Sequence, residues 1–487
     1  MRPAQLEHAT PAPSTSFRYR ELAGFITGLI HAGTLAPGER VPSLREISRQ
    51  KRTSVTTALQ AYRLLEDQGV LEARPQSGFY VARASLDIEA PAMTRRAARP
   101  TDVAVPAIML ELLEHAADPR LVPLGCAIPS PQLLGSGRLD RCLARAARVK
   151  GVRHNVYMPP RGDPGLRREI ARRALRWGQA LSPDDVLVTC GCTEALGIAL
   201  KAVTRPGGTV ALESPTYFGL LQVLQSLGLK ALELPTDART GVDLDALRSA
   251  CREHAPAACV LASSYHNPLG FTLDEARKRQ VLAVLARHRI PLVEDDVYGD
   301  LGFASERPRP YIALDANDGV LYCGSFSKTL APGYRIGWIA TGARHMPRVI
   351  EAKVASTLSG AVLPQVALAD FLSSGGYDHH LRRIRGMFQE TLHRMVVTIE
   401  QAFPTGTRVS QPAGGFVLWL ELPKPADSRM LFVQALERGV CFAPGVVFSA
   451  SGRYAQCMRL SGGHGWSPRL EKGLRELGTL ASRRNRR

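Results

Sequence analysis

Short apolar runs alternate with segments of helical pattern along most of the chain, from about residue 121 onward. Clear examples of such runs are residues 185–189, 209–212, 259–262 and 291–294. Strands that are separated by helices in this way are typical of a mostly parallel sheet with helices on its faces. The alternation therefore predicts an α/β domain over residues 121–487.

The length and composition agree with a protein of several domains. A chain of 487 residues exceeds the usual size of a single core. Hydrophobic residues make up 45% and charged residues 22%, values typical of soluble globular proteins. No signal peptide or membrane-spanning apolar run is visible, and the nine cysteines lack the CxxC spacing. We expect a cytoplasmic protein with reduced thiols and no metal site.

The residues before 121 divide into two further stretches. Residues 17–83 have a compact helical pattern that ends in a strand, a turn and a second strand. The next stretch is rich in Ala, Pro and Arg, which is typical of a linker that is semi-rigid at its prolines. Leu110, Leu112 and Leu113 predict a short helix near its end. The expected organisation is a first domain over 1–84, a linker over 85–120 and a large domain over 121–487.

The spacing of apolar residues in the first domain predicts three helices followed by a β-hairpin. The first helix has one apolar face, formed by Leu22, Phe25, Ile26, Leu29 and Ile30. Ser43 with Glu46 three residues later has the pattern of a capping box, and Ser54 precedes the third helix. The segment 69–81 predicts two short strands around a turn. This order is that of a winged helix-turn-helix, whose third helix would enter the major groove of DNA.

Several polar residues of this module are candidates for contact with DNA phosphates and base edges. They are Ser43, Arg45, Ser54, Thr56 and Thr57 on and before the helices, and Arg74 and Gln76 on the wing. A solvated polar face is the alternative interpretation for each of them. Net charge adds little support for DNA binding by this module. Residues 1–90 hold 11 Lys and Arg against 9 Asp and Glu, although the whole chain carries a net charge of +18.

The segment around Lys328 carries the strongest chemical signal in the large domain. It reads Gly324-Ser-Phe-Ser-Lys-Thr-Leu-Ala-Pro-Gly-Tyr-Arg-Ile-Gly-Trp338. A lysine amine near the hydroxyls of Ser325 and Ser327 and the guanidinium of Arg335 suits a Schiff-base lysine beside a phosphate site. An ordinary lysine in a surface loop is the alternative. The combination indicates pyridoxal 5'-phosphate (PLP) as a cofactor.

Other segments upstream supply the remaining groups that such a cofactor needs. Asp295 ends a predicted strand and could pair with the pyridine nitrogen, whereas the next aspartate could simply cap a helix. Tyr298 and Asn267 could both donate hydrogen bonds to the ring oxygen. Backbone N–H groups at Cys192 and Thr193, where a helix follows a strand, would form an anion site, and Tyr217 could lie over the ring. A redox role for Cys192 and a plain core role for Tyr217 are the alternatives.

These residues, in this order, resemble the fold type I (aspartate aminotransferase-like) PLP enzymes over residues 121–487. The resemblance implies a fold of that type, with a small C-terminal α+β subdomain. It implies that Tyr157 reaches the phosphate from a partner subunit, so that the protein is a homodimer. It also implies that Arg459, in Met458-Arg459-Leu460-Ser461, binds a ligand carboxylate. After Tyr157 the chain reads Met-Pro-Pro and departs from the commoner Tyr-Gly-x-Pro.

The first domain resembles the GntR type of regulators, whose signature has the form P-G-x-x-L-P-S-x-R-x-L. Here Val41 replaces the first leucine, and Lys51-Arg-Thr-Ser-Val55 departs from the family's apolar-Gly-Val-Ser-Arg run. A GntR-like module joined to an aminotransferase-like domain is similar to the MocR (GabR-like) subfamily of transcription regulators.

This resemblance implies a DNA-binding regulator that senses PLP or an amino compound by Schiff-base exchange at Lys328. Its partners would be operator DNA, the small-molecule effector and a second copy of the chain. The alternative is a working aminotransferase that also carries a DNA-binding module, because Lys328, Asp295 and Arg459 are all retained. A third interpretation is a PLP-binding module that has lost both ligand response and catalysis.

Overall fold

The computed structural model divides the chain into two compact units, Met1–Asp87 and Ile88–Arg487. Each unit is described by itself. The residues that the structure describes are 15–31, 34–35, 39–67, 70–74, 78–81, 89–93, 99–104, 107–116, 118–134, 137–148, 155–304 and 306–484. Among the helices of these ranges, none combines the length and apolar character that crossing a membrane requires.

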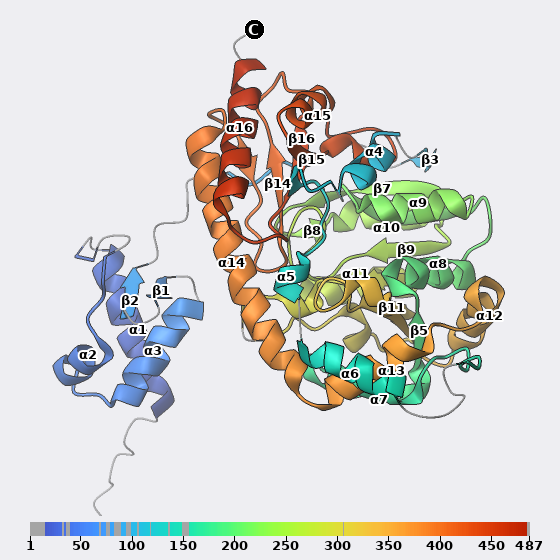
Figure 1. The fold of residues 1–487 in the computed structure, drawn as a ribbon, viewed down its shortest axis with the longest axis horizontal. Coiled ribbons are helices and arrows are strands. Elements are labelled where there is room, and N and C mark those ends of the chain that lie inside the picture. Colours follow the sequence, from blue (N-terminus) through green and yellow to red (C-terminus); the bar gives the residue numbers. More distant parts are fainter. Residues whose placement is uncertain are drawn as a thin grey trace, which may run out of the picture. The chain divides into compact units, whose positions relative to one another are not determined.

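The N-terminal unit is a winged helix-turn-helix, as the apolar spacing predicts (Figure 1). Its elements are α1 (Thr15–His31), α2 (Leu44–Gln50), α3 (Val55–Asp67) and the antiparallel pair β1 (Leu71–Arg74) and β2 (Gly78–Val81). Leu22 and Ile26 of α1 pack with Tyr62 of α3 in its core. The hydroxyl of Tyr62, which is fully buried, donates to the carbonyl of Pro42 at 2.7 Å, so this polar group is satisfied inside the core.

The large unit is built on one extended sheet with the strand order β3-β7-β6-β9-β10-β11-β12-β5. The neighbours β7, β6, β9, β10 and β11 are parallel, whereas β12 runs antiparallel to both β11 and β5. The mostly parallel sheet predicted from the apolar runs is therefore confirmed. The strands are β3 (Pro100–Asp102), β5 (Val186–Thr189), β6 (Thr209–Ser214), β7 (Lys230–Asp237), β8 (Gly241–Val242), β9 (Ala258–Leu261), β10 (Leu292–Asp295), β11 (Val320–Ser325) and β12 (Gly337–Ala340).

Helices cover both faces of this sheet, which explains why its strands are apolar on both sides (Figure 1). Successive residues of β5 show the division, since Val186 and Val188 join one buried cluster and Leu187 joins the other. The cluster around Leu187 includes side chains of α8 (Gly191–Val203), α9 (Phe218–Ser226) and α12 (Met346–Thr357). The other cluster includes side chains of α6 (Gly137–Arg148), α7 (Pro164–Ala174), α10 (Leu244–His254), α11 (Glu275–Arg287) and α13 (Val362–Ser373).

A second, smaller sheet forms the C-terminal α+β subdomain, in the order β13-β14-β16-β15-β4. Its strands are β4 (Val122–Leu124), β13 (Arg408–Val409), β14 (Val417–Glu421), β15 (Val440–Pro444) and β16 (Cys457–Ser461). Its helices are α14 (Gly376–Ala402), α15 (Ser428–Glu437) and α16 (Pro468–Arg484). Figure 1 shows the long helix α14, in orange, running past both sheets of the unit.

Part of the predicted linker is built into the large unit. Strand β3 pairs antiparallel with β7, and the N–H of Val409 donates to the carbonyl of Glu89 at 3.0 Å. Farther along, α4 (Ala107–His115) buries Met109 and Leu112 completely. The predicted helix near Leu110 is therefore present, and among residues 89–93 and 99–104 the chain already contacts both sheets. The short helix α5 (Pro131–Leu134) follows.

Candidate functional site

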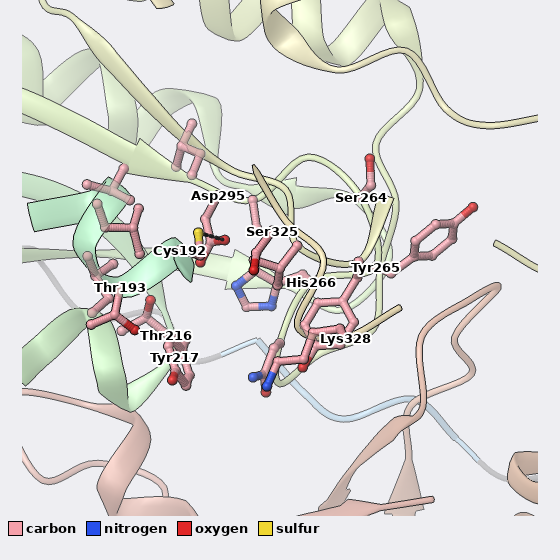
Figure 2. A pocket seen from close by; sticks show the side chains of 18 of the residues that line it. Cys192, Thr193, Thr216, Tyr217, Ser264, Tyr265, His266, Asp295, Ser325 and Lys328 are labelled. Carbon is pink, nitrogen blue, oxygen red and sulfur yellow. Dashed lines mark hydrogen bonds between the residues drawn. The ribbon is translucent and has the colours of Figure 1, made fainter. Parts of the chain in front are cut away.

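A cavity of about 160 Å³ lies at the carboxyl ends of the parallel strands, where ligands bind in open α/β sheets. Strands β5, β6, β9, β10 and β11 all end at this edge, so the residues that follow them converge. Of the predicted cofactor residues, all except Tyr157 line the cavity, namely Cys192, Thr193, Tyr217, Asn267, Asp295, Tyr298, Ser325, Ser327, Lys328 and Arg335. Figure 2 shows Cys192, Asp295, Ser325 and His266 close together, with Lys328 nearby.

Of the two adjacent aspartates at the end of β10, Asp295 faces the cavity. Its Oδ1 atom lies 3.6 Å from the thiol of Cys192, and burial raises the pKa of Asp295 to about 6. The neighbouring Asp296 is also buried, but it accepts a hydrogen bond from Arg307 at 2.6 Å and one from Tyr322 at 3.1 Å. The two adjacent carboxylates thus have separate surroundings, and only Asp295 is available to a ligand in the cavity.

One end of the cavity has the features of an anion site. The hydroxyl oxygen of Ser325 lies 2.9 Å from that of Ser327, and Arg335 donates to the carbonyl of Cys190 at 3.2 Å. Helix α8 begins here, so its first N–H groups are available to an anion. Gly191 has φ +78°, and a Cβ added to it would lie only 2.5 Å from Nη2 of Arg335. Glycine is therefore required for the guanidinium to approach this turn so closely.

Lys328 and Tyr298 carry the polar groups at the other end. The Nζ atom of Lys328 donates to the carbonyl of Ala127 at 2.7 Å. Burial, with a further contribution from the charge of Arg459, lowers the pKa of Lys328 to about 8. This brings its amine close to being neutral and nucleophilic at physiological pH. The buried hydroxyl of Tyr298 has no hydrogen-bond partner in the part of the chain that the structure describes, which leaves a donor free inside the cavity.

Arg459, on β16, is fully buried beside this end of the cavity. Its guanidinium donates to Oδ1 of Asn267 at 3.3 Å and to the carbonyl of Gly125, and it lies 5.3 Å from the ring centre of Phe448. No carboxylate pairs with it among the described residues, and its Nε atom has no partner. A buried guanidinium without a counter-ion suits an anionic ligand group.

Some groups of this site were not predicted from the sequence. His266 and Glu213 line the cavity, with Nε2 of His266 lying 3.4 Å from Glu213. The position of His266, directly before Asn267, was a signal that could have identified it. The carbonyls of Gly125 and Ala127 left no signal, because a backbone acceptor has no characteristic side chain. Within the described residues, no cluster of three or more His, Cys, Asp and Glu is placed to hold a metal ion.

Tyr157 does not belong to the cavity of its own chain. Its side chain is 84% exposed.

The predicted DNA contacts on the helices include exposed side chains, exposed helix caps and one buried residue. Arg45 and Thr56 are exposed. Ser43 and Ser54 accept hydrogen bonds from backbone N–H groups at the starts of α2 and α3, at 3.3 and 3.0 Å, so both are helix caps. Thr57 is only 5% exposed and its hydroxyl lies 2.8 Å from that of Ser54. This burial argues against the predicted DNA contact of Thr57, because α3 turns that side chain toward the core.

The wing lies partly outside the described residues. Gln76 is not described, and of Arg74 only the backbone is. Pro37-Gly38, a dipeptide typical of a turn between the first two helices, also lies outside the described residues.

Comparison with known families places both parts of the chain. Residues 132–468 match the family of class I and II aminotransferases, and residues 18–81 match the bacterial regulatory proteins of the gntR family. The chain therefore belongs to the class I and II aminotransferase family and carries a gntR-family domain at its N-terminus. This confirms the fold classes and the fused architecture inferred from the sequence.

Individual relatives share either the whole architecture or the large unit alone. The chain is 39% identical to the uncharacterized HTH-type transcriptional regulator YdcR of Escherichia coli over 468 residues, which cover 96% of this chain and 99% of that protein. It is 32% identical to 2-aminoadipate transaminase of Thermus thermophilus over 372 residues, 76% of this chain and 92% of that one. The crystal structure of the α-aminoadipate aminotransferase LysN from T. thermophilus, complexed with N-(5'-phosphopyridoxyl)-L-leucine, superposes with a TM-score of 0.72 at 29% identity, covering 77% and 95% of the two chains.

Proposed function

We propose that this protein is a transcription regulator that binds PLP in its aminotransferase-like unit and changes its affinity for DNA when an amino compound, or PLP itself, binds there. The observation that carries the proposal is the half-buried amine of Lys328, with its lowered pKa, in a cavity with an anion site at its other end. The same chain carries a gntR-family domain over residues 18–81, which an enzyme acting only on metabolites would not need. We expect it to act in the cytoplasm, where bacterial DNA lies.

The polar groups of the cavity fit PLP. Ser325, Ser327, Arg335 and the N–H groups at the start of α8 would hold its phosphate. Asp295 would pair with the pyridine nitrogen, and the unpartnered hydroxyl of Tyr298 would donate to the ring oxygen. When bound, PLP supplies an aldehyde that exchanges reversibly between amines, so Lys328 and an incoming amine compete for it.

Arg459 would select ligands that carry a carboxylate. Its planar fork can bind a carboxylate through two hydrogen bonds, and Asn267 beside it orients the guanidinium. A ligand with both an amine and a carboxylate would therefore be favoured over a simple amine. Such a ligand can shift the protein between states only if it binds one of them more tightly.

A second candidate function is amino-acid transamination. It is favoured by the retention of Lys328, Asp295 and Arg459 in one cavity and by the 32% identity to a 2-aminoadipate transaminase. The alignment with an HTH-type transcriptional regulator extends over 96% of this chain, which favours regulation as the main role. We further propose a homodimer of the MocR type, in which the exposed Tyr157 completes the phosphate site of the partner subunit.

The decisive experiment follows cofactor, DNA and product in one titration. The PLP-loaded protein is titrated with a panel of amino acids while the visible absorbance of bound PLP, the affinity for its own upstream DNA and the formation of keto acid are measured. A change in absorbance that is accompanied by a change in DNA affinity, without sustained keto-acid formation, supports the function as a regulator. Continuous keto-acid formation with unchanged DNA affinity would instead identify an aminotransferase.

Arg459 provides the matched variants for this titration. Arg459→Ala should weaken the response to carboxylate-bearing ligands far more than it weakens PLP binding. Arg459→Lys keeps the charge but loses the fork, so it should restore only part of the response. An unchanged response in Arg459→Ala would show that the effector is not held through a carboxylate at this position.

A further inference from the structure

Residues 125–128, which we call the strap, contact both of the groups that the proposed function assigns to the ligand. The carbonyl of Ala127 accepts the hydrogen bond of Lys328 Nζ, and the carbonyl of Gly125 accepts one from Arg459. The two carbonyls are two residues apart on one segment directly after β4, which bends at Gly125 and Cys126. The amine and the guanidinium therefore each have a hydrogen-bond partner in the strap.

We propose that the strap acts as an internal substitute for the ligand, released from Arg459 only when a bound ligand carries a carboxylate. This inference rests on the proposed function and specifies how the same site would be regulated. The physical reason is competition, since the fork of one buried guanidinium cannot bind the Gly125 carbonyl and a ligand carboxylate in the same place. Charge-assisted hydrogen bonds are the stronger kind, so a carboxylate would displace a neutral carbonyl.

The two strap contacts respond to different events. Covalent attachment of PLP to Lys328 removes the free amine, so the contact to Ala127 is lost while that of Gly125 with Arg459 remains. A ligand that takes PLP from Lys328 and places a carboxylate on Arg459 has the opposite effect. It frees the lysine amine for Ala127 and releases Gly125. The strap thus distinguishes bound cofactor from bound amino acid.

The strap is packed against the segment that leads to it from the N-terminal side. The thiol of Cys126 lies 3.7 Å from the carbonyl of Leu112 in α4, and a Cβ on Gly125 would lie 2.6 Å from Cδ1 of Leu112. Helix α4 follows β3 in the chain, and β3 follows residues 89–93, the part of the large unit that comes first in the sequence. Release of Gly125 would therefore disturb α4. Because β3 and residues 89–93 precede α4 in the chain, α4 is covalently connected through them to the DNA-binding domain.

The release can be measured at Cys126, which the strap buries to 7% exposure. Cofactor-free protein is mixed with N-(5'-phosphopyridoxyl)-L-leucine or with its decarboxylated counterpart, N-(5'-phosphopyridoxyl)-isoamylamine. Both leave Lys328 free, and they differ only in the carboxylate. Maleimide labelling of Cys126, followed by peptide mass spectrometry, should accelerate at least about tenfold with the leucine compound only, the change expected on losing one charge-assisted hydrogen bond. Cys323, fully buried in β11, is the control for unfolding.

The outcomes separate the two proposals. If neither compound binds, as judged by calorimetry, the proposed PLP site is wrong. If both bind and Cys126 is labelled equally fast with each, the PLP site stands and the strap inference is overturned. Labelling that accelerates with the leucine compound alone supports it.

A pair of variants tests the strap without any ligand. In Gly125→Ala the new Cβ would meet Leu112 and Cys441, at 2.6 and 2.8 Å, so the strap should move away from Arg459. We expect labelling of Cys126 in this variant to match that of the wild type with the leucine compound. Leu112→Ala in the same protein removes one of the clashing atoms and should slow the labelling again. Unchanged labelling in Gly125→Ala, with Cys323 still protected, would contradict the inference.

Discussion

At the scale of single residues, the site depends on charges that burial makes costly. Lys328 and Asp295 are both half-buried at the cavity, and their partial removal from water is the main cause of the shift in the pKa of each, downward for the amine and upward for the carboxyl. Each charged form is unfavourable for the stability of the folded protein without a ligand, whereas in the proposed complex both groups interact with PLP. Two predictions follow from this imbalance.

The first concerns the rate at which PLP reacts with the cofactor-free protein. Because the neutral amine is the nucleophile and the pKa of Lys328 is lowered to about 8, the rate should rise with pH and level off above about 8. In Arg459→Ala the midpoint should move upward, because the charge of Arg459 contributes to the lowered pKa. Stopped-flow absorbance measures the rate, and Lys328→Ala is the control that should not react. A midpoint near 10.5 would identify an ordinary lysine.

The second concerns Asp295→Asn, which keeps the shape of the side chain and removes its charge. PLP affinity should fall about tenfold or more, since a hydrogen bond to a charged group contributes about 1.5–3 kcal/mol. The cofactor-free variant should be more stable than the wild type at pH 7, by about 3 kcal/mol at most. The sign follows because the folded state holds the proton of Asp295 up to about pH 6, so this group lowers stability as pH rises from about 4 to 6. Thermal unfolding at pH 4 and pH 7 checks it, and an equal difference at both pH values would contradict it.

At the scale of elements, the helices and strands were predictable where the signal is local. The apolar runs gave β5, β6, β9 and β10 to within a few residues, and Ser54 marked the start of α3. Other features depend on contacts far apart in the chain. For Thr57 a local signal was present, because it lies four residues before Ala61 and eight before Leu65 on the buried face of α3. Its hydroxyl and its place near the start of the helix suited a polar contact equally well.

Strand β3 is an element that the local sequence did not predict. Its Ala-, Pro- and Arg-rich surroundings are typical of a chain that does not pack, yet Pro100 to Asp102 pair with β7. An edge strand tolerates proline, because only one side of its backbone needs hydrogen bonds. Composition cannot reveal that a distant strand offers a free edge. Likewise, Arg459 contacts Asn267 only because the small and the large sheet pack together, and no local sequence pattern predicts that packing.

Helix α2 provides a prediction about DNA. Arg45 is exposed on it, and Arg45→Ala should weaken DNA binding without changing the absorbance of bound PLP. If Arg45 contacts a phosphate, the slope of affinity against salt should decrease by about 1, whereas a base contact would cost about 1–3 kcal/mol on the specific sequence only. Arg348→Ala, on the exposed surface of α12, is the matched control. DNA affinity that stays unchanged in Arg45→Ala would remove this residue from the interface.

At the scale of the whole molecule, the two units have separate hydrophobic cores. Leu22, Ile26 and Tyr62 form the core of the N-terminal unit with other residues of that unit alone. Independent cores predict independent unfolding. Calorimetry should therefore show two transitions, and saturating PLP should raise only the one that belongs to the large unit, because a ligand stabilises the part that binds it. A single transition that shifts as a whole would mean that the units unfold together.

The pairing along β7 has a further consequence for solubility. On the side of β7 away from β6, residues Lys230–Leu232 pair with β3 and residues Thr236–Asp237 pair with β8. These two short strands cover backbone groups that would otherwise offer a template for strand addition from another molecule. Strand β3, which precedes most of the aminotransferase-like fold in the chain, thus helps to protect the open edge of its sheet against aggregation. A fragment that begins after Asp102 should keep the large unit's core but self-associate, and light scattering of that fragment beside one that begins at Ile88 would show it.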